Sequence, residues 1–208
     1  MELASGLGAT KDGRVTTSER PVPAAPPDPG ALLIRHAAGD ATAFGELVAA
    51  YRRPVYSWLV RCGVRDGDRD DLFQAVFLRL HRAAALYRPE RPAHPWIFTI
   101  VANEVRTYLR RRRIRELVLA PPPESEPPAT APDAQQAAEA RETVAWLERQ
   151  LPRLPLAQRE ALLLVGIQGR SLSEAAEALG RPVNTIKTHL RRARLSLAEK
   201  LARRRAEG

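Results

Sequence analysis

Residues 171–194 have the pattern of two short helices joined by a tight turn, and no other stretch constrains the fold so strongly. Ala176, Gly180 and Ile186 stand where a helix-turn-helix needs a small contact residue, a turn glycine and a buried aliphatic side chain. Such units place their second helix in the major groove of DNA. The segment therefore predicts a helical domain that binds duplex DNA.

The second helix of this pair has two contrasting faces. Aliphatic residues at spacings of three and four should face the protein core: Val183, Ile186, Leu190, Ala193, Leu197 and Leu201. From Lys187 to Arg205 there are eight Lys or Arg against one acid. A solvated basic helix end is the simpler alternative, but amides, hydroxyls and cations together suit base edges and phosphates. We predict a DNA-binding face of Arg181, Asn184, Thr185, Lys187, Thr188, Arg191 and Arg192.

The composition limits the other possibilities. The formal net charge of +9 in 208 residues favours a polyanionic partner, although an anionic membrane would attract it too. Cys62 is the only cysteine, so no disulfide can form within the chain, and paired metal-binding cysteines are absent. No run of eighteen apolar residues occurs, and the first thirty residues lack a signal-peptide core. We expect a cytoplasmic protein without membrane insertion.

Two clusters of proline divide the chain. Five prolines lie between Pro21 and Pro29, and six between Pro121 and Pro132. Proline-rich stretches do not propagate helices. They predict a disordered tail over 1–28, a flexible linker over 119–136, and domains over 29–118 and 137–208. No useful strand alternation appears in either domain, so the predicted fold is all-α: two small helical domains joined by a Pro-rich linker.

Local signals mark where helices should begin and end. Asp40 is an expected N-cap for the second helix, and the third should start after Asp68. A loop with three prolines separates it from a fourth helix, expected from about Trp96 to Leu119. In the second domain, Gly169 should end a nearly all-apolar helix, and Ser171 with Glu174 forms a capping-box pattern.

The fourth helix is a second cationic region. Between Glu104 and Arg115 there are six arginines and one acid. Trp96, Phe98 and Tyr108 lie on the same helix, and aromatic rings beside cations suit single-stranded nucleic acid. Two alternatives are that Trp96 and Phe98 belong to the core, and that the arginines form a membrane-surface patch. The lack of an apolar face over 104–115 argues against the membrane.

Together these motifs resemble a known family. Residues 70–78, 87–92, 95–98 and 102–103, followed by the arginine run, resemble region two of bacterial RNA polymerase sigma factors. Residues 151–201 resemble region four. The order and the short linker are similar to those of the extracytoplasmic-function (ECF) group. The resemblance covers about 30–118 and 138–203, and it departs from the family pattern at Ala75, Thr107 and Pro182.

The resemblance implies partners and sites. The third helix would dock on the clamp of core RNA polymerase through Asp70, Asp71, Gln74, Phe77 and Leu78. The proline loop and fourth helix would capture unstacked minus-ten bases through Tyr87, Arg88, Arg91, Asn103, Arg106 and Arg110. Region four would read the minus-thirty-five element and meet the polymerase flap. Members of the family are commonly held inactive by an anti-sigma factor.

The leading hypothesis is thus a sigma factor that recognises and melts promoter DNA, with two separate cationic modules gripping the duplex at two places. Whether the two domains pack together stays open. No nucleophile, phosphate loop or metal signature is present, so we expect no enzyme activity, cofactor or metal. One alternative is a stand-alone helix-turn-helix regulator that binds duplex DNA as a dimer. A more remote one is a structural protein that binds RNA or a membrane surface.

Overall fold

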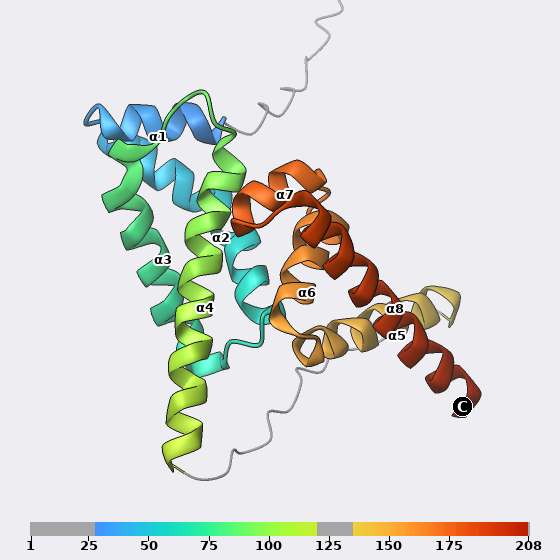
Figure 1. Ribbon diagram of the computed structural model, residues 1–208. Coiled ribbons are helices and arrows are strands. Elements are labelled where there is room, and N and C mark those ends of the chain that lie inside the picture. Colours follow the sequence, from blue (N-terminus) through green and yellow to red (C-terminus); the bar gives the residue numbers. More distant parts are fainter. Residues whose placement is uncertain (1–27, 120–134, 208) are drawn as a thin grey trace, which may run out of the picture.

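The computed structural model describes residues 28–119 and 135–207, and every element in these two segments is helical (Figure 1). The all-α prediction is confirmed for them. The predicted tail over 1–28 and linker over 119–136 lie outside the described residues, apart from their ends. The N-terminal half contains α1 (Pro29–Ala37), α2 (Ala41–Arg61), η1 (Asp66–Asp68), α3 (Arg69–Ala83), η2 (Ala84–Leu86) and α4 (Ala93–Leu119).

The C-terminal half is built around a short apolar helix. Its elements are α5 (Gln135–Gln150), η3 (Leu151–Arg153), α6 (Leu156–Ala161), η4 (Leu162–Ile167), α7 (Leu172–Leu179) and α8 (Val183–Glu207). The segment η4 continues α6 with π-helical hydrogen bonding. Gly169, at a φ of 65°, follows its end, as the sequence predicts.

Aspartates start the first two helices. The Asp40 carboxylate accepts the backbone N–H of Thr42 at 2.8 Å and of Ala43 at 3.3 Å, so the predicted cap is confirmed. Asp28 caps α1 in the same way, which the sequence reading missed. The hydrogen bonds from Thr42 and Arg35 hold the pKa of Asp40 well below its ordinary value. Both caps satisfy helix N–H groups that otherwise have no partner within the helix.

Helix α4 begins at Ala93, three residues before the expected Trp96. The carbonyl of Pro92 accepts the Trp96 N–H at 3.4 Å and begins the helical hydrogen bonding. Pro95 is compatible with this start because the first turn of a helix needs no donor from it. The earlier start brings His94 into the helix.

The helix-turn-helix has its expected local chemistry. Ser171 and Glu174 make the reciprocal capping box at the start of α7, and Gly180 turns the chain at a φ of 60°. The predicted apolar stripe of α8 is wrong at Val183, which is exposed, because the buried face begins only at Ile186. Pro182 stands just before α8, and its carbonyl accepts the Ile186 N–H at 3.2 Å.

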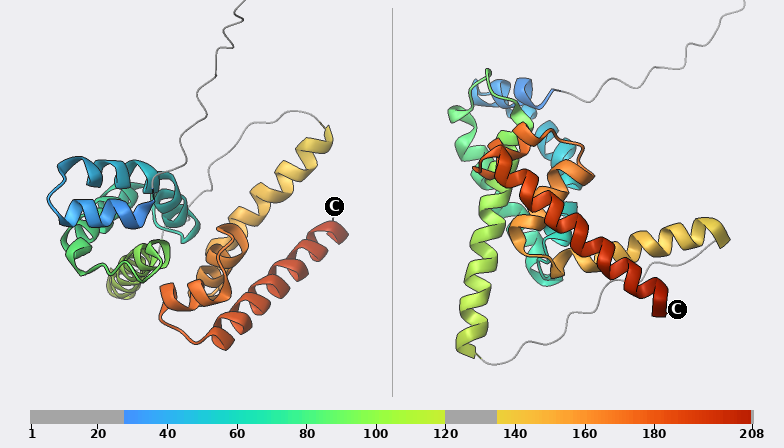
Figure 2. Two further views of the ribbon diagram at one scale, coloured as in Figure 1. Left: turned by 90° about the horizontal axis from the view of Figure 1, so that it is seen from above. Right: turned by 45° about the vertical axis from the view of Figure 1, so that its right-hand side comes forward.

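The two halves pack together through one hydrophobic core. Helix α7 lies against the N-terminal half of α4, and α6 lies beside the C-terminal part of α2 (Figure 1). Seen from above, α5 and α8 run side by side away from the N-terminal helices (Figure 2), joined by an ion pair between Arg204 and Glu142. The question of whether the two domains pack together, which the sequence leaves open, is answered here: they do in this structure.

Candidate nucleic-acid interface

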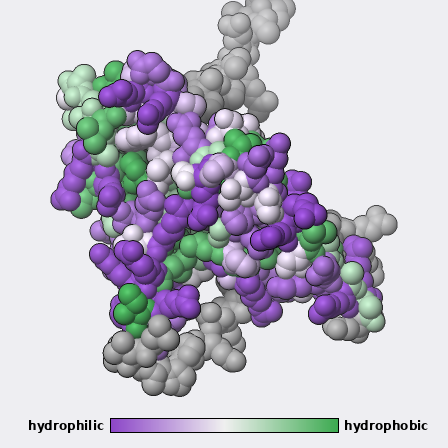
Figure 3. Space-filling model, viewed as in Figure 1, coloured by the Kyte–Doolittle hydropathy of each residue, from purple (hydrophilic) through white to green (hydrophobic). Residues whose placement is uncertain are grey.

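The outer face of α8 is open and cationic. The inner face of α8 is buried against the rest of the C-terminal half through Ile186, Leu190 and Ala193, and this packing holds the helix in place. Hydrophilic side chains cover the face along which α8 runs (Figure 3). Within the described segments, no acid pairs with the four cations predicted there. Thr185 is half-buried and the other six predicted residues are exposed: Arg181, Asn184, Lys187, Thr188, Arg191 and Arg192.

Two of these cations also act on a histidine of α8. The pKa of His189 is lowered by burial and further by the positive charges of Arg181 and Arg192. The Thr188 hydroxyl donates to the Asn184 carbonyl at 3.0 Å, so its oxygen can still accept a hydrogen bond. The arrangement offers a polyanion a positively charged surface that needs no rearrangement of existing ion pairs.

Helix α4 carries its cations differently. Arg106 donates from Nε and Nη2 to the two carboxylate oxygens of Glu160, both at 2.9 Å. It also donates to the side-chain oxygen of Asn103 at 3.2 Å. Farther along, Arg112 donates to Glu116 at 2.6 Å and to the carbonyl of Gly63 at 3.2 Å. Two of the predicted minus-ten residues, Asn103 and Arg106, are thus already bonded within the chain.

The proline loop is fastened to the start of α4. The Tyr87 hydroxyl donates to the Arg91 carbonyl at 2.7 Å, and its ring meets Trp96 edge-on at 5.3 Å. Trp96 is half-buried, whereas Phe98 is fully buried, 5.2 Å from the Trp58 ring. Phe98 is therefore a core residue and not a stacking platform. The remaining predicted minus-ten cations are exposed: Arg88, Arg91 and Arg110.

The surface of α3 presents most of the residues that the resemblance assigns to polymerase. Asp70, Asp71 and Gln74 are exposed, and Leu78 has half of its surface exposed. Phe77 is buried instead, with its ring 4.6 Å from Phe73 and 6.4 Å from Phe44. Phe77 packs on the buried side of α3, so its side chain is not accessible to a partner.

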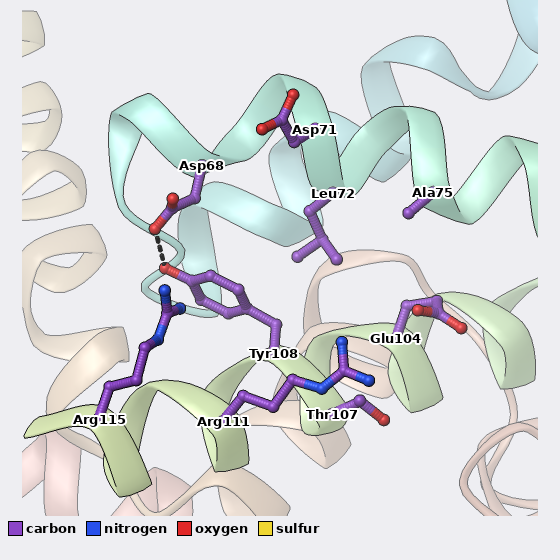
Figure 4. A pocket seen from close by; sticks show the side chains of 9 residues that line it. All are labelled: Asp68, Asp71, Leu72, Ala75, Glu104, Thr107, Tyr108, Arg111 and Arg115. Carbon is purple, nitrogen blue, oxygen red and sulfur yellow. Dashed lines mark hydrogen bonds between the residues drawn. The ribbon is translucent and has the colours of Figure 1, made fainter. Parts of the chain in front are cut away.

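A cleft of about 230 Å³ lies between α3 and α4 (Figure 4). The Tyr108 hydroxyl donates to Asp68, the last residue of η1 just before α3, at 2.6 Å and ties α4 to the start of α3. Arg111 and Arg115 project from α4 into the same space. The other lining residues are Asp71, Leu72, Ala75, Glu104 and Thr107, so two departures from the family pattern, Ala75 and Thr107, lie at one cleft.

The contacts between the two halves include residues that the sequence reading missed. Arg159 is buried and donates to the carbonyls of Cys62, Pro152 and Leu154, and burial lowers its pKa. Its neighbour Glu160 holds Arg106. A signal was available, because Arg159 and Glu160 are adjacent charges directly before the apolar run 161–165, and buried charges need partners.

A histidine makes a further contact between the halves. His94 Nδ1 lies 3.2 Å from the Tyr51 hydroxyl, and Nε2 lies 3.0 Å from the Gln168 side-chain oxygen. Burial lowers the pKa of His94. The neutral ring can accept from Tyr51 and donate to Gln168 at once, which satisfies both nitrogens. The described residues contain no cluster of metal-binding side chains, and none of their helices has the length and apolar character needed to span a bilayer.

Both halves of the chain match known protein families. The family of sigma-70 region 2 matches residues 47–114, and that of sigma-70 region 4 matches residues 145–197. The RNA polymerase sigma factor NccH of Alcaligenes xylosoxydans xylosoxydans is 32% identical over 169 residues, covering 80% of this chain and 91% of NccH. The ECF sigma factor SigM of Mycobacterium tuberculosis is 33% identical over 170 residues, covering 82% and 83% of the two chains.

Solved structures agree with this relationship. CnrH in complex with the cytosolic domain of CnrY superposes with a TM-score of 0.64 at 28% identity, covering 85% of this chain and 98% of CnrH. RpoE of Bartonella quintana, in complex with the anti-sigma factor NepR, has a TM-score of 0.61 at 20% identity, covering 78% of this chain and 98% of RpoE, and supports the fold alone. The two regions define a sigma-70-type protein. The chain belongs to the ECF RNA polymerase sigma factors.

Proposed function

We propose that this sigma factor binds core RNA polymerase and directs it to promoters with a minus-ten and a minus-thirty-five element. The observation that carries the proposal is the open cationic face of α8, on a helix-turn-helix within a chain that matches sigma factors over both halves. A stand-alone dimeric regulator is not favoured, because relatives named as RNA polymerase sigma factors match most of the chain.

Each site has a supporting feature. The exposed part of α3, namely Asp70, Asp71, Gln74 and Leu78, is the proposed clamp-binding surface. The proline loop and α4 are proposed to bind unpaired minus-ten bases, and α8 to bind the minus-thirty-five duplex. Unstacking a base step costs on the order of a few kcal/mol, and stacking on an aromatic ring returns about 1–3 kcal/mol per base. Base capture therefore needs no nucleotide hydrolysis, and we propose no catalytic role.

The proposed partners follow from the relatives. CnrH, 28% identical to this chain, forms a complex with the cytosolic domain of CnrY, and RpoE, which shares its fold, forms one with the anti-sigma factor NepR. We propose that an anti-sigma protein also binds this chain, and that the chain acts in the cytoplasm, where core polymerase is found. The proposed domains remain 29–118 and 137–208, with the polymerase flap as the partner of the second.

Run-off transcription with purified core polymerase and promoter fragments mapped after overexpression tests the function. We expect specific transcripts that require the chain. The double variant Asp71→Asn with Gln74→Ala should lose co-purification with core enzyme while keeping its helical circular-dichroism spectrum. Arg82→Ala, an exposed change at the other end of α3, is the matched control and should bind normally. Absence of any promoter-specific transcript with wild-type protein would contradict the proposal.

A further inference from the structure

The proline loop between η2 and α4 is closed on itself by Tyr87. The Tyr87 hydroxyl donates to the carbonyl of Arg91 at 2.7 Å, and the Arg91 N–H donates to the carbonyl of Arg88 at 3.0 Å. These two bonds fix the backbone that carries Arg88 and Arg91, whose side chains are exposed. The hydroxyl hydrogen of Tyr87 is thus engaged within the chain, where it shapes the loop that holds two of the proposed DNA-binding arginines.

Helix α1 lies directly against this hydroxyl. Gly30, in the first turn of α1, is buried, and a Cβ built there would lie 2.9 Å from the Tyr87 hydroxyl oxygen. That distance is shorter than van der Waals contact allows, so only glycine leaves the hydroxyl in place. Asp28 caps the same turn by accepting the Gly30 N–H at 3.1 Å, and its negative charge adds to burial in raising the pKa of Tyr87. The first turn of α1 is therefore built around the Tyr87 hydroxyl.

The place of α1 in the chain makes this contact informative. The family of sigma-70 region 2 matches residues 47–114, so α1 precedes the matched segment. Helix α1 packs against both η2 and α4, the two elements that flank the loop. It can therefore hold the loop in position without taking part in any contact with DNA.

We propose that Tyr87 and Gly30 are positioning residues for the capture of unpaired minus-ten bases. The Tyr87 hydroxyl, kept in place by α1, fixes the proline loop in the shape that binds DNA. A loop that is already ordered binds more tightly, because less conformational freedom is lost on binding. The inference rests on the proposed function of the loop, and it gives the Tyr87 hydroxyl a positioning role in place of the direct DNA contact that the resemblance implies.

Two substitutions disturb the loop from opposite sides of this contact, and only one of them changes a group that DNA could touch. Tyr87→Phe removes the hydroxyl and keeps the ring. Gly30→Ala adds a buried methyl group that displaces the hydroxyl from Arg91. Polymerase holoenzyme assembled with either variant should bind a short single-stranded DNA of the mapped minus-ten sequence about two- to tenfold more weakly, as the loss of one hydrogen bond predicts. Binding of a minus-thirty-five duplex should be unchanged.

The effects of the two substitutions should not add. Once Tyr87→Phe has removed the hydroxyl, the methyl group of Gly30→Ala no longer meets it, so the double variant should bind the single strand as Tyr87→Phe alone does. Gly45→Ala, in α2 with nothing within 4 Å of the added Cβ, is the matched control for Gly30→Ala. Tyr56→Phe, at another half-buried tyrosine, is the control for loss of a hydroxyl. Both controls should bind normally.

The shape of the loop is measured without DNA or polymerase by fluorine NMR of the free chain labelled with fluorotryptophan. The Tyr87 ring meets Trp96 edge-on, with ring centroids 5.3 Å apart, so a displaced Tyr87 should shift the Trp96 resonance. The variant Trp96→Phe identifies that resonance by its loss. Tyr87→Phe and Gly30→Ala should both shift it, whereas Gly45→Ala should not. Circular dichroism checks that each variant remains helical.

Weaker single-strand binding by Tyr87→Phe alone, with normal binding by Gly30→Ala, would make Tyr87 a direct DNA contact and overturn the positioning role. Additive losses in the double variant, or an unchanged Trp96 resonance in both variants, would overturn it too. Weaker single-strand binding by both, with no further loss in the double variant and normal duplex binding, supports the proposal. Run-off transcription by the wild-type chain tests the proposed function separately. Specific transcripts from the wild type, combined with normal single-strand binding by both variants, would reject the positioning role alone.

Discussion

Helices α4 and α8 are both rich in arginine, yet two arginines of α4 are held by acids whereas the predicted DNA-binding cations of α8 are not, within the described segments. On α4, Arg106 is held by Glu160 of the other half, and Arg112 is held by Glu116 one turn away. On α8, Lys187, Arg191 and Arg192 point outward and have no ion-pair partner among residues 28–119 and 135–207. The comparison teaches that a run of cations marks a surface for polyanions only where no acid of the same protein already occupies it.

The largest expected effect comes from removing the support beneath the open face. Ile186 is fully buried on the inner side of α8. Ile186→Ala should lower the free energy of unfolding by about 2–5 kcal/mol, because it removes buried methyl groups and leaves a cavity. Chemical denaturation followed by circular dichroism measures the loss. Leu195→Ala, at a half-exposed position on the same helix, should change stability by less than about 0.5 kcal/mol; equal losses would contradict the assigned inner face.

The comparison becomes sharper when one cation is removed from each helix. Arg191→Ala should weaken binding of promoter duplex by the free chain. If Arg191 contacts a base, the loss should be about 1–3 kcal/mol. If it contacts a phosphate, the slope of binding affinity against salt concentration on logarithmic scales should also become smaller by about 1. Arg106→Ala should leave duplex binding by the free chain nearly unchanged, because Glu160 already neutralises Arg106. Fluorescence anisotropy over a range of salt concentrations measures both. A larger loss for Arg106→Ala would reverse the proposed roles.

The sequence predicts α8 better than it predicts α4, for a physical reason. The start of the helix-turn-helix, its turn and its inner face depend on local signals such as Ser171, Gly180 and the spacing of aliphatic residues, all of which lie within a few turns. The exposed face of α8 follows directly from its buried face. Val183 differs because it lies in the first turn, where the helix has not yet reached the core.

The state of α4 depends on residues distant in the sequence. Arg106 and Glu160 are 54 positions apart, and His94 and Gln168 are 74 apart. Periodicity within one helix contains no information about which helix of the other half will cover it. Phe77 illustrates the same limit, because a motif assigned it to a partner surface while its neighbours Phe44 and Phe73 bury it.

The turn that leads into α8 offers a smaller effect. Gly180 has a φ of 60°, and a Cβ there would meet nothing within 4 Å. Gly180→Ala should therefore lose about 1–2 kcal/mol through backbone strain alone. Gly45, inside α2, also has open space around it, and Gly45→Ala should gain about 0.5–1 kcal/mol because alanine favours helix. Denaturation midpoints of the two variants should move in opposite directions; movement in the same direction would contradict the left-handed turn.

The smallest expected effect is a pH dependence at the start of α4. Burial lowers the pKa of His94, while the hydrogen bond to Gln168 and the charge of Glu174 partly oppose that shift and Arg170 adds to it. The folded protein then binds fewer protons at this site than the unfolded chain does, so stability rises with pH in this range. The contribution is complete above the ordinary histidine pKa of about 6.5 and is lost as the pH falls from there towards the lowered value. Denaturant midpoints measured between pH 7.5 and 5.5 should decline.

A matched pair of variants shows which histidine causes that decline in stability. His94→Gln does not titrate, and it should lose part of the pH dependence along with the bridge from Tyr51 to Gln168. His189, whose pKa is also lowered, lies on α8, so His189→Gln should remove only the part of the decline that His189 itself contributes. Energy transfer between dyes on Ile34→Cys and Val144→Cys, two exposed positions in opposite halves, reports opening. Protonation of His94 should lower the transfer, because His94 bridges Tyr51 and Gln168 across the two halves. Acid-induced opening that survives in His94→Gln would assign the effect to another group at the interface. Glu160 cannot be that group, because burial raises its pKa and its protonation therefore favours the buried state over opening.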